Sequence, residues 1–147
     1  MTNWACKKFQ ELSVDELYAI LRLRSEVFVV EQNCVFLDMD NKDPHCHHLM
    51  GWRDGLLAGY SRLIPSGISY VESSIGRIVT SPAARRLGVG RELLSKSIDT
   101  LYTLYGKQPV RIGAQCYLKT FYESFGFVQN GEIYLEDGIK HIEMLLL

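Results

Sequence analysis

The residues with the clearest chemical potential lie in a glycine-rich stretch near the middle of the chain. Residues 84–93 read ARRLGVGREL, so that Arg85, Arg86 and Arg91 flank Gly88 and Gly90. A strand is predicted before this stretch and a helix after it, which places its amides at a helix N-terminus, a setting that favours phosphate. Glycine has no Cβ, and a ligand can therefore approach the main chain closely. A glycine-rich turn with solvated arginines would give the same pattern.

Two other nucleotide-binding patterns are missing from this stretch. It lacks the Lys-Ser/Thr pair with which a P-loop grips a triphosphate and its magnesium, and its spacing differs from the GxGxxG of dinucleotide-binding folds. The pattern RxxGxG therefore predicts a phosphate-binding loop of another kind.

A tyrosine in the last third of the chain is the best candidate for an acid. Tyr122 lies in YLKTFYESFG, residues 117–126, which is predicted to form a short helix ended by Gly126. The tyrosine hydroxyl has a reference pKa near ~10 and stays protonated at neutral pH, so it can give a proton to a leaving group. Phenylalanines surround Tyr122 in the sequence, and a buried core aromatic is the competing interpretation.

Two further residues are candidates for handling an amine. Glu31 in VVEQN has apolar residues before it and polar residues after it, which indicates either a carboxylate at a pocket edge or the end of a helix. His141 in IKHIE is a candidate general base, because histidine side chains can accept a proton near neutral pH, although a lone histidine on a strand is more often a structural residue. We expect Glu31 to contact a substrate ammonium, and the base stays open, with a water relay as another route.

The loop DMDNKDPHCHH, residues 38–48, invites two metal interpretations, and neither fits. An EF-hand fails because Lys42 stands at the fifth position, Asp43 replaces the glycine and Leu49 replaces the final glutamate. The histidines and cysteine at 45–48 lack the second spaced pair of a zinc site. We therefore expect no metal, and interpret the loop either as an acidic rim of an acceptor pocket or as solvated charge.

Hydrophobic spacing and turn residues predict a mixed α/β (α+β) domain around one largely antiparallel sheet. Ser13 and Glu16 form a predicted capping box for a helix that continues, with a bend, to about residue 32. A turn at 54–55 predicts a hairpin over 48–64, and Gly106 ends a helix with a buried stripe at 94, 98, 101 and 105. The other strands are predicted at 4–10, 70–80, 109–115 and, around a turn at 137–138, within 127–146.

Length and composition are those of one ordinary domain covering residues 1–147, with 47% hydrophobic and 22% charged residues. Sixteen basic against seventeen acidic residues give a net charge of −1, which favours neither nucleic acid nor an anionic membrane as a partner. The start, MTNWACKKFQ, lacks the pattern of a signal peptide, so we expect a cytoplasmic protein. The four cysteines form no CxxC pair, and a disulfide framework is not expected.

Two motifs taken together resemble the GNAT N-acetyltransferase superfamily. RRLGVG, residues 85–90, is similar to its Q/R-x-x-G-x-G/A motif, and GAQCYLKTFYESFGF, residues 113–127, is similar to its N-x-x-A-x-x-F-Y-x-x-x-G-F signature. LRLRSEVFVVEQN and EDGIKHI look like the ElaA-like branch of bacterial acyltransferases, and the resemblance covers nearly the whole chain. It implies the GNAT acyl-CoA N-acyltransferase fold, a central twisted, mostly antiparallel sheet of about six to seven strands flanked by about four helices.

The resemblance also implies roles for single residues. In the family the amides of the RxxGxG loop hold the pyrophosphate of acetyl-CoA, here Arg85, Arg86, Leu87, Gly88, Val89, Gly90 and Arg91. The preceding strand lends main-chain groups to the pantetheine arm and the thioester carbonyl, here Ile78, Val79 and Thr80. Tyr122 takes the place of the usual general acid, while Gln115 and Leu118 stand where the family often has Asn and Ala. The glutamate base of many members would fall at Ser74, with Glu72 one same-face step earlier.

The expected activity is direct transfer of an acetyl group from acetyl-CoA to a primary amine, of a small molecule or a peptide, in a ternary complex. Such a reaction needs amides for the developing oxyanion, a base for the ammonium and an acid for the sulfur. The alternative is a non-catalytic acyl-CoA-binding module on the same fold, which would keep the loop and lose the acid, so that Tyr122 favours the enzyme. The expected partner is an amine acceptor, and a homodimer stays open.

Overall fold

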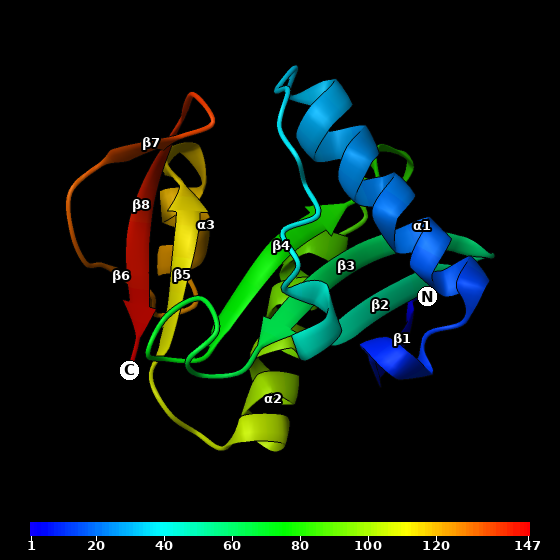
Figure 1. Ribbon diagram of the computed structural model, residues 1–147, viewed down its shortest axis with the longest axis horizontal. Coiled ribbons are helices and arrows are strands. Elements are labelled where there is room, and N and C mark those ends of the chain that lie inside the picture. Colours follow the sequence, from blue (N-terminus) through cyan, green and yellow to red (C-terminus); the bar gives the residue numbers. More distant parts are fainter.

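Four antiparallel strands form the N-terminal sheet in the computed structural model, which describes residues 1–147 (Figure 1). Their order across the sheet is the order along the chain, and they are β1 (Asn3–Lys8), β2 (His47–Arg53), β3 (Leu56–Ile64) and β4 (Ser74–Thr80). The predicted hairpin at 54–55 joins β2 to β3, with Asp54 and Gly55 both at positive φ, as a two-residue turn between twisted strands requires.

The C-terminal strands form a second antiparallel sheet around one long strand. β8 (Ile139–Leu146) pairs along its length with β5 (Val110–Gln115), and its other edge pairs with β6 (Val128–Gln129) and β7 (Tyr134–Glu136). Two final strands were expected after residue 127, and three are present because the segment between β6 and β7 leaves the sheet edge.

The expectation of a single sheet is therefore wrong: the strands divide into two sheets that meet at one point. Ser73, directly before β4, forms an isolated parallel bridge with Val110, and the Arg111 amide donates to the Ser73 carbonyl oxygen at 3.0 Å. Beyond this bridge β4 pairs only with β3 and β5 only with β8. Sequence periodicity describes each strand's own faces but not the strand beside it, so it could not show this division.

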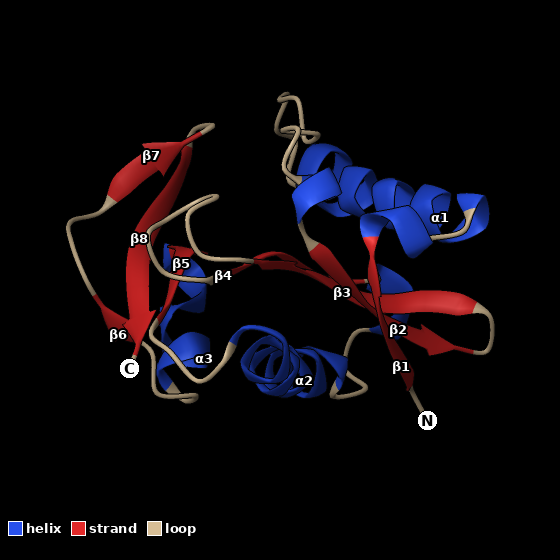
Figure 2. Ribbon diagram, turned by 60° about the horizontal axis from the view of Figure 1, so that its bottom comes forward, coloured by secondary structure: helices blue, strands red, loops and turns tan.

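Two helices cover opposite faces of the N-terminal sheet (Figure 2). α1 (Val14–Arg24) packs Ile20 and Leu23 against Met50 of β2, whereas α2 (Val89–Tyr105) packs its leucines against the neighbouring Leu49. Adjacent strand residues thus face different helices, as the two-residue strand period requires. A fully buried leucine contributes roughly 1.5–3 kcal/mol. The third α-helix is α3 (Lys119–Glu123), beside β5.

Helix ends follow the local sequence signals. The capping box is confirmed, because Ser13 Oγ accepts from the Glu16 amide at 3.0 Å and Glu16 Oε1 accepts from the Ser13 amide at 2.8 Å. Gly106 ends α2 at positive φ, as predicted. The expected bend after α1 is a π-helix, Ser25–Glu31, and the shorter 3-10 helices are Phe9–Glu11, Asp43–His45, Pro82–Ala84 and Cys116–Leu118.

The acidic loop after the π-helix is folded inward onto arginines. Fully buried Arg24 donates from Nε to Asp38 and from Nη1 to Asp43, each at 2.8 Å. Arg62 of β3 donates to both oxygens of Asp40 and to Asp43. Neither interpretation made from the sequence describes these carboxylates, which are neither solvated nor free at a rim but paired inside the protein.

A buried histidine completes this cluster. The Asp43 carbonyl oxygen can only accept, so His48 Nε2 donates to it at 2.9 Å and His48 Nδ1 accepts from the Tyr60 hydroxyl at 2.6 Å. Burial lowers the pKa of His48, which keeps the ring neutral in this arrangement. The four cysteines are free, and none of the helices has the length and apolarity needed to cross a membrane.

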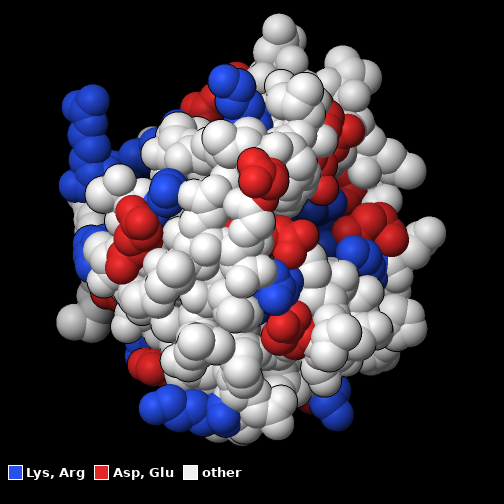
Figure 3. Space-filling model, turned by 90° about the vertical axis from the view of Figure 1, so that its left-hand side faces the viewer, with Lys and Arg blue, Asp and Glu red and all other residues white.

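Acidic and basic side chains are interspersed on the face formed by the C-terminal half (Figure 3). No broad field of one sign covers that face, in agreement with the net charge of −1. Electrostatic attraction by this face is therefore local rather than spread over the surface.

Replacing Arg24 should test how far the fold depends on the buried ion pairs. Arg24→Leu removes one of the two arginine partners of each buried carboxylate, leaving Asp38 with Arg77 and Asp43 with Arg62, so we expect a loss of about 3–5 kcal/mol in the free energy of unfolding. Burial raises the pKa of Asp43 while the Arg24 hydrogen bond and the Arg62 charge lower it, with a net lowering. This contribution is present above the unfolded-state pKa near ~3.9, so the difference from wild type should narrow as pH falls below ~4.

Arg22→Leu on the same helix is the matched control, because Arg22 is exposed and reaches Glu26 only at 3.8 Å. We expect a change of about 0.5 kcal/mol or less for this pair. Chemical denaturation at pH 7 measures the loss in each variant, and a second series at about pH 3 tests whether the difference narrows. Equal losses for the two variants at pH 7 would contradict a central role for the buried pairs.

Candidate active site

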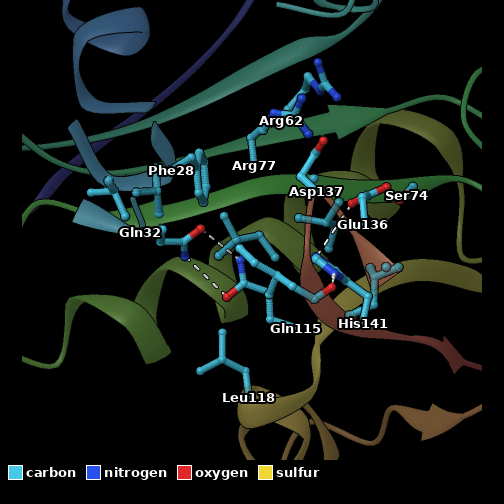
Figure 4. Close-up of a pocket in the computed structure, with 18 of the residues that line it drawn as sticks. Phe28, Gln32, Arg62, Ser74, Arg77, Gln115, Leu118, Glu136, Asp137 and His141 are labelled. Carbon is cyan, nitrogen blue, oxygen red and sulfur yellow. Dashed lines mark hydrogen bonds and ion pairs between the residues drawn. The ribbon is translucent and has the colours of Figure 1, made fainter. Parts of the chain in front are cut away.

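A cavity of about 750 Å³ lies between β4 and β5, where the two sheets separate. Its walls come from the π-helix, the acidic loop, β3, β4, β5, α3 and the β7–β8 hairpin. Figure 4 shows Gln32 and Gln115 meeting across it, with Glu136, Asp137 and His141 grouped to one side. Segments far apart in the sequence thus face one internal space.

A β-bulge distorts β4 along the cavity wall. Tyr60 pairs with Val79 and Arg62 with Gly76, so that Ser61 on β3 faces two residues of β4, Arg77 and Ile78. Arg77 has a φ of 50°, in the left-handed region. Bulges re-aim side chains and main-chain groups, and here Ile78, Val79 and Thr80 all line the cavity.

The predicted phosphate loop leads directly into α2 with unused amides. No hydrogen bond within the chain starts from the main-chain amides of residues 86–91, and Gly88 caps α2 with a φ of 75°. A second cavity of about 330 Å³ lies against Thr80, Arg86, Gly88, Gly90 and Phe121. Free amides at the positive end of a 17-residue helix can bind an anion such as a phosphate.

The three arginines of this loop have different surroundings. Arg85 donates through both terminal nitrogens to Glu31, at 2.6 and 2.5 Å. Arg91 lies over the Phe125 ring at 4.6 Å and donates to Ser124 Oγ, whereas Arg86 is exposed at a φ of 68°. Arg86 is thus the arginine whose charge is not engaged by another side chain.

Glu31 lies at the end of the π-helix, at the cavity edge, with both oxygens on Arg85. The Arg85 hydrogen bond lowers the pKa of Glu31, and the same bond raises the pKa of Arg85. The pair ties the end of the π-helix to the phosphate loop across the cavity. Both oxygens of Glu31 are therefore engaged by Arg85, and a substrate ammonium at this position would have to share them.

Tyr122 lines the cavity from α3 with a buried ring. Phe121 and Phe127 pack edge-on against it, with ring centroids at 5.4 and 5.9 Å. Burial raises the pKa of the Tyr122 hydroxyl well above its usual value, so the hydroxyl is protonated at neutral pH. Tyr122 is thus a core aromatic, as one interpretation held, and it also lines the cavity, while its role as an acid stays a prediction.

Gln115 ends β5 and reaches across the cavity. Its side chain and that of Gln32 exchange hydrogen bonds of 3.3 and 3.4 Å, and Leu118 lies nearby on the same wall (Figure 4). The buried thiol of Cys34 donates to the Asp137 carbonyl oxygen at 3.2 Å. Residues 31–34 therefore form a strap that holds both halves of the molecule.

His141 of β8 lies directly opposite Gln115 and lines the cavity, with 7% of its surface exposed. Ser74, the position at which many family members would have a glutamate base, is buried in the cavity wall, and Glu72, one same-face step earlier, lies outside the cavity in an ion pair with Arg111 at 3.0 Å. Neither offers a free carboxylate to the cavity.

Comparisons with known proteins agree with this geometry. Residues 15–147 match the family model of an acetyltransferase (GNAT) domain. The chain is 43% identical to protein ElaA of Escherichia coli K12 over 146 residues, which cover 98% of this chain and 95% of that protein. The fold matches the crystal structures of Escherichia coli ElaA and of an acyl-CoA N-acyltransferase from Pseudomonas aeruginosa with TM-scores of 0.93 and 0.94, each at 42% identity over 100% of both chains.

The chain belongs to the GNAT acetyltransferase family. The expected fold and the resemblance to the ElaA-like branch are thereby confirmed, with eight strands and three α-helices in place of the six to seven strands and four helices expected.

Sequence reasoning missed Gln32 and Glu136 as cavity residues of this GNAT domain. A signal for Glu136 was present, because a two-residue turn at 137–138 fixes the register that sets Tyr134 opposite His141 and Glu136 on the same face as Tyr134. Gln32 had no such signal, since its partner Gln115 is 83 residues away.

Gly90 gives a sharper test of the phosphate loop than Gly88. A Cβ on Gly88 would strain a positive-φ residue, whereas a Cβ on Gly90 meets only Thr80 Cγ2 at 3.9 Å, and Gly90 lines both cavities. We expect Gly90→Val to weaken acetyl-CoA binding at least tenfold, about 1.4 kcal/mol, without loss of thermal stability. Isothermal calorimetry and a melting curve measure the two quantities.

Ser95→Val is the control, because Ser95 is exposed on the same helix and lies outside the cavities. Wild-type affinity in a folded Gly90→Val protein would remove the loop from the ligand site.

Proposed function

We propose that residues 1–147 act as one acetyltransferase domain that transfers the acetyl group of acetyl-CoA to a primary amine. The observation that carries this proposal is the cavity between β4 and β5, which joins an anion-binding helix end to a buried, protonated tyrosine. The Pseudomonas aeruginosa structure, described as an acyl-CoA N-acyltransferase, supports it at 42% identity.

The residues present fit acetyl-CoA. Its pyrophosphate would accept hydrogen bonds from the free amides of residues 86–91, with Arg86 adding charge. The missing Cβ of Gly90 leaves room beside those amides. Ile78, Val79 and Thr80 on the bulged strand, together with Gln115 on β5, would hold the pantetheine arm between the two sheets.

Acetyl-CoA supplies an acyl group already activated as a thioester. The protein then holds the thioester in place, stabilises the developing charge and supplies a proton to the leaving group. The bulge at Arg77 turns main-chain groups of β4 toward the cavity, where an amide can stabilise a developing oxyanion. The Tyr122 hydroxyl donates a proton to the departing sulfur, because its raised pKa keeps it protonated.

Release of CoA thiol tests the function. Mixing the protein with acetyl-CoA and a panel of polyamines, amino acids and peptide amines should give thiol release that depends on both substrates. Acetyl-CoA binding without release for any amine would favour the acyl-CoA-binding module instead.

Tyr122→Phe tests the role of the hydroxyl. The change removes one oxygen and almost no volume, so the aromatic packing against Phe121 and Phe127 should persist. We expect kcat to fall about tenfold to a thousandfold, with acetyl-CoA affinity and melting temperature nearly unchanged.

The same change at Tyr102, a half-buried tyrosine on α2 outside the cavity, is the control and should leave kcat as in the wild type. A Tyr122→Phe enzyme with wild-type kcat, under conditions where the chemical step limits turnover, would exclude Tyr122 as the acid.

A further inference from the structure

The charged residues that line the cavity are unevenly paired. Of its carboxylates, Glu31 is held by Arg85, and Asp40 by Arg62 and Arg77. The other two, Glu136 and Asp137, have no lysine or arginine partner. All three arginines of the cavity wall are already in ion pairs, and Lys42, the one lysine there, donates to Ser69 Oγ. The end of the cavity formed by the β7–β8 hairpin is therefore its electronegative end.

The hairpin turn sets which side chains face this end. Asp137 and Gly138 have φ of 50° and 78°, a two-residue turn that pairs Glu136 with Ile139 and Tyr134 with His141. Side chains alternate along a strand, so Tyr134 and Glu136 share one face of the hairpin with Ile139 and His141. All four residues line the cavity.

The hydrogen bonds of His141 define which nitrogen is free. Its Nδ1 lies 2.8 Å from the Ile139 carbonyl oxygen, and a carbonyl can only accept, so Nδ1 carries the proton of the neutral ring. The lone pair is then on Nε2, which lies 3.6 Å from Glu136 Oε2. A basic nitrogen and a free carboxylate thus lie side by side at the same end of the cavity (Figure 4).

Aromatic packing holds the imidazole in place. The Tyr134 ring stacks on it, with centroids 5.7 Å apart and planes at 27°. The Tyr134 hydroxyl is fixed in turn, because it lies over Gly113, where a Cβ would be only 2.8 Å away, beside the Tyr70 hydroxyl. The ring of His141 is therefore held in an orientation that leaves Nε2 available to accept a proton.

We propose that Glu136 and His141 form the acceptor site: Glu136 binds the ammonium group of a cationic primary amine, and His141 Nε2 takes a proton from it. This inference rests on the proposed function. It assigns to the hairpin the ammonium contact that the sequence suggested for Glu31, whose oxygens are occupied by Arg85. Carboxylates on a water-accessible rim favour a cationic acceptor over a neutral or anionic one.

Every proton moved in the acetyl transfer can be assigned to a residue of this chain, to a substrate or to solvent. The ammonium gives up one proton to His141 Nε2, which passes it to solvent, and the freed electron pair forms the new C–N bond. The C–S bond breaks with its electron pair on sulfur, which takes a proton from Tyr122. The amide nitrogen loses its second proton, which restores the Tyr122 hydroxyl. One proton is released in each turnover.

Glu136→Gln is the main test, because Glu136 is exposed and its replacement leaves the fold intact. We expect KM for the amine to rise at least tenfold and acetyl-CoA affinity to stay unchanged. Glu132→Gln, an exposed change in the segment before β7 and outside the cavity, should leave the amine KM as in the wild type.

His141→Gln separates the base from the ammonium contact. We expect kcat to fall at least tenfold and the amine KM to stay within twofold of wild type. Unchanged amine KM in Glu136→Gln, or wild-type kcat in His141→Gln, would overturn the inference while leaving the acetyltransferase proposal intact.

Direct binding distinguishes failure of the inference from failure of the proposed function. Calorimetry with spermidine, lysine amide and an N-terminally free peptide amide should show at least one amine that binds tenfold more weakly to Glu136→Gln. The same result in a protein that releases no thiol would contradict the proposed function alone. Binding of no amine in this set to the wild type would overturn the acceptor site.

Discussion

The bridge between Ser73 and Val110 is the point at which β4 and β5 are hydrogen-bonded to each other, and each strand pairs along its length within a different sheet. A strand edge without a neighbour leaves main-chain amides and carbonyls unpaired, a state that proteins otherwise avoid. Here the two free edges enclose the cavity, together with α3, the π-helix and the β7–β8 hairpin. The site depends on this separation, since β4 and β5 hydrogen-bonded along their whole length would leave no cavity between them.

The two halves are nevertheless tied together by side chains on one rim. Glu31–Arg85, Gln32–Gln115 and Cys34–Asp137 link the end of the π-helix to the phosphate loop, to β5 and to the hairpin turn. Behind this strap, buried arginines hold the acidic loop against α1 and β3, so that the strap has a fixed base. Buried pairs of this kind specify one arrangement of a loop more than they stabilise it.

Much of the local structure could be predicted from the sequence. The capping box at Ser13, the turn at 54–55 and the glycine that ends α2 act within a few residues, and each was found where the pattern indicated. What could not be predicted are partners distant in the sequence. The sequence of the acidic loop suggests unpaired carboxylates at a pocket rim, because nothing in that segment shows that they pair with Arg24 and Arg62. Glu31 reads as an open carboxylate for the same reason, since Arg85 lies 54 residues away.

The central claim is that the free amides before and at the start of α2 hold the pyrophosphate of a CoA thioester between the two sheets. The most direct measurement is an amide NMR titration of the labelled protein with CoA and, separately, with pantetheine, which has the arm but no phosphate. We predict that CoA shifts the amides of residues 86–91 together with those of Ile78, Val79, Thr80 and Gln115, whereas pantetheine shifts those on β4 and β5 and leaves residues 86–91 unchanged. Shifts from CoA that leave residues 86–91 unchanged would contradict it.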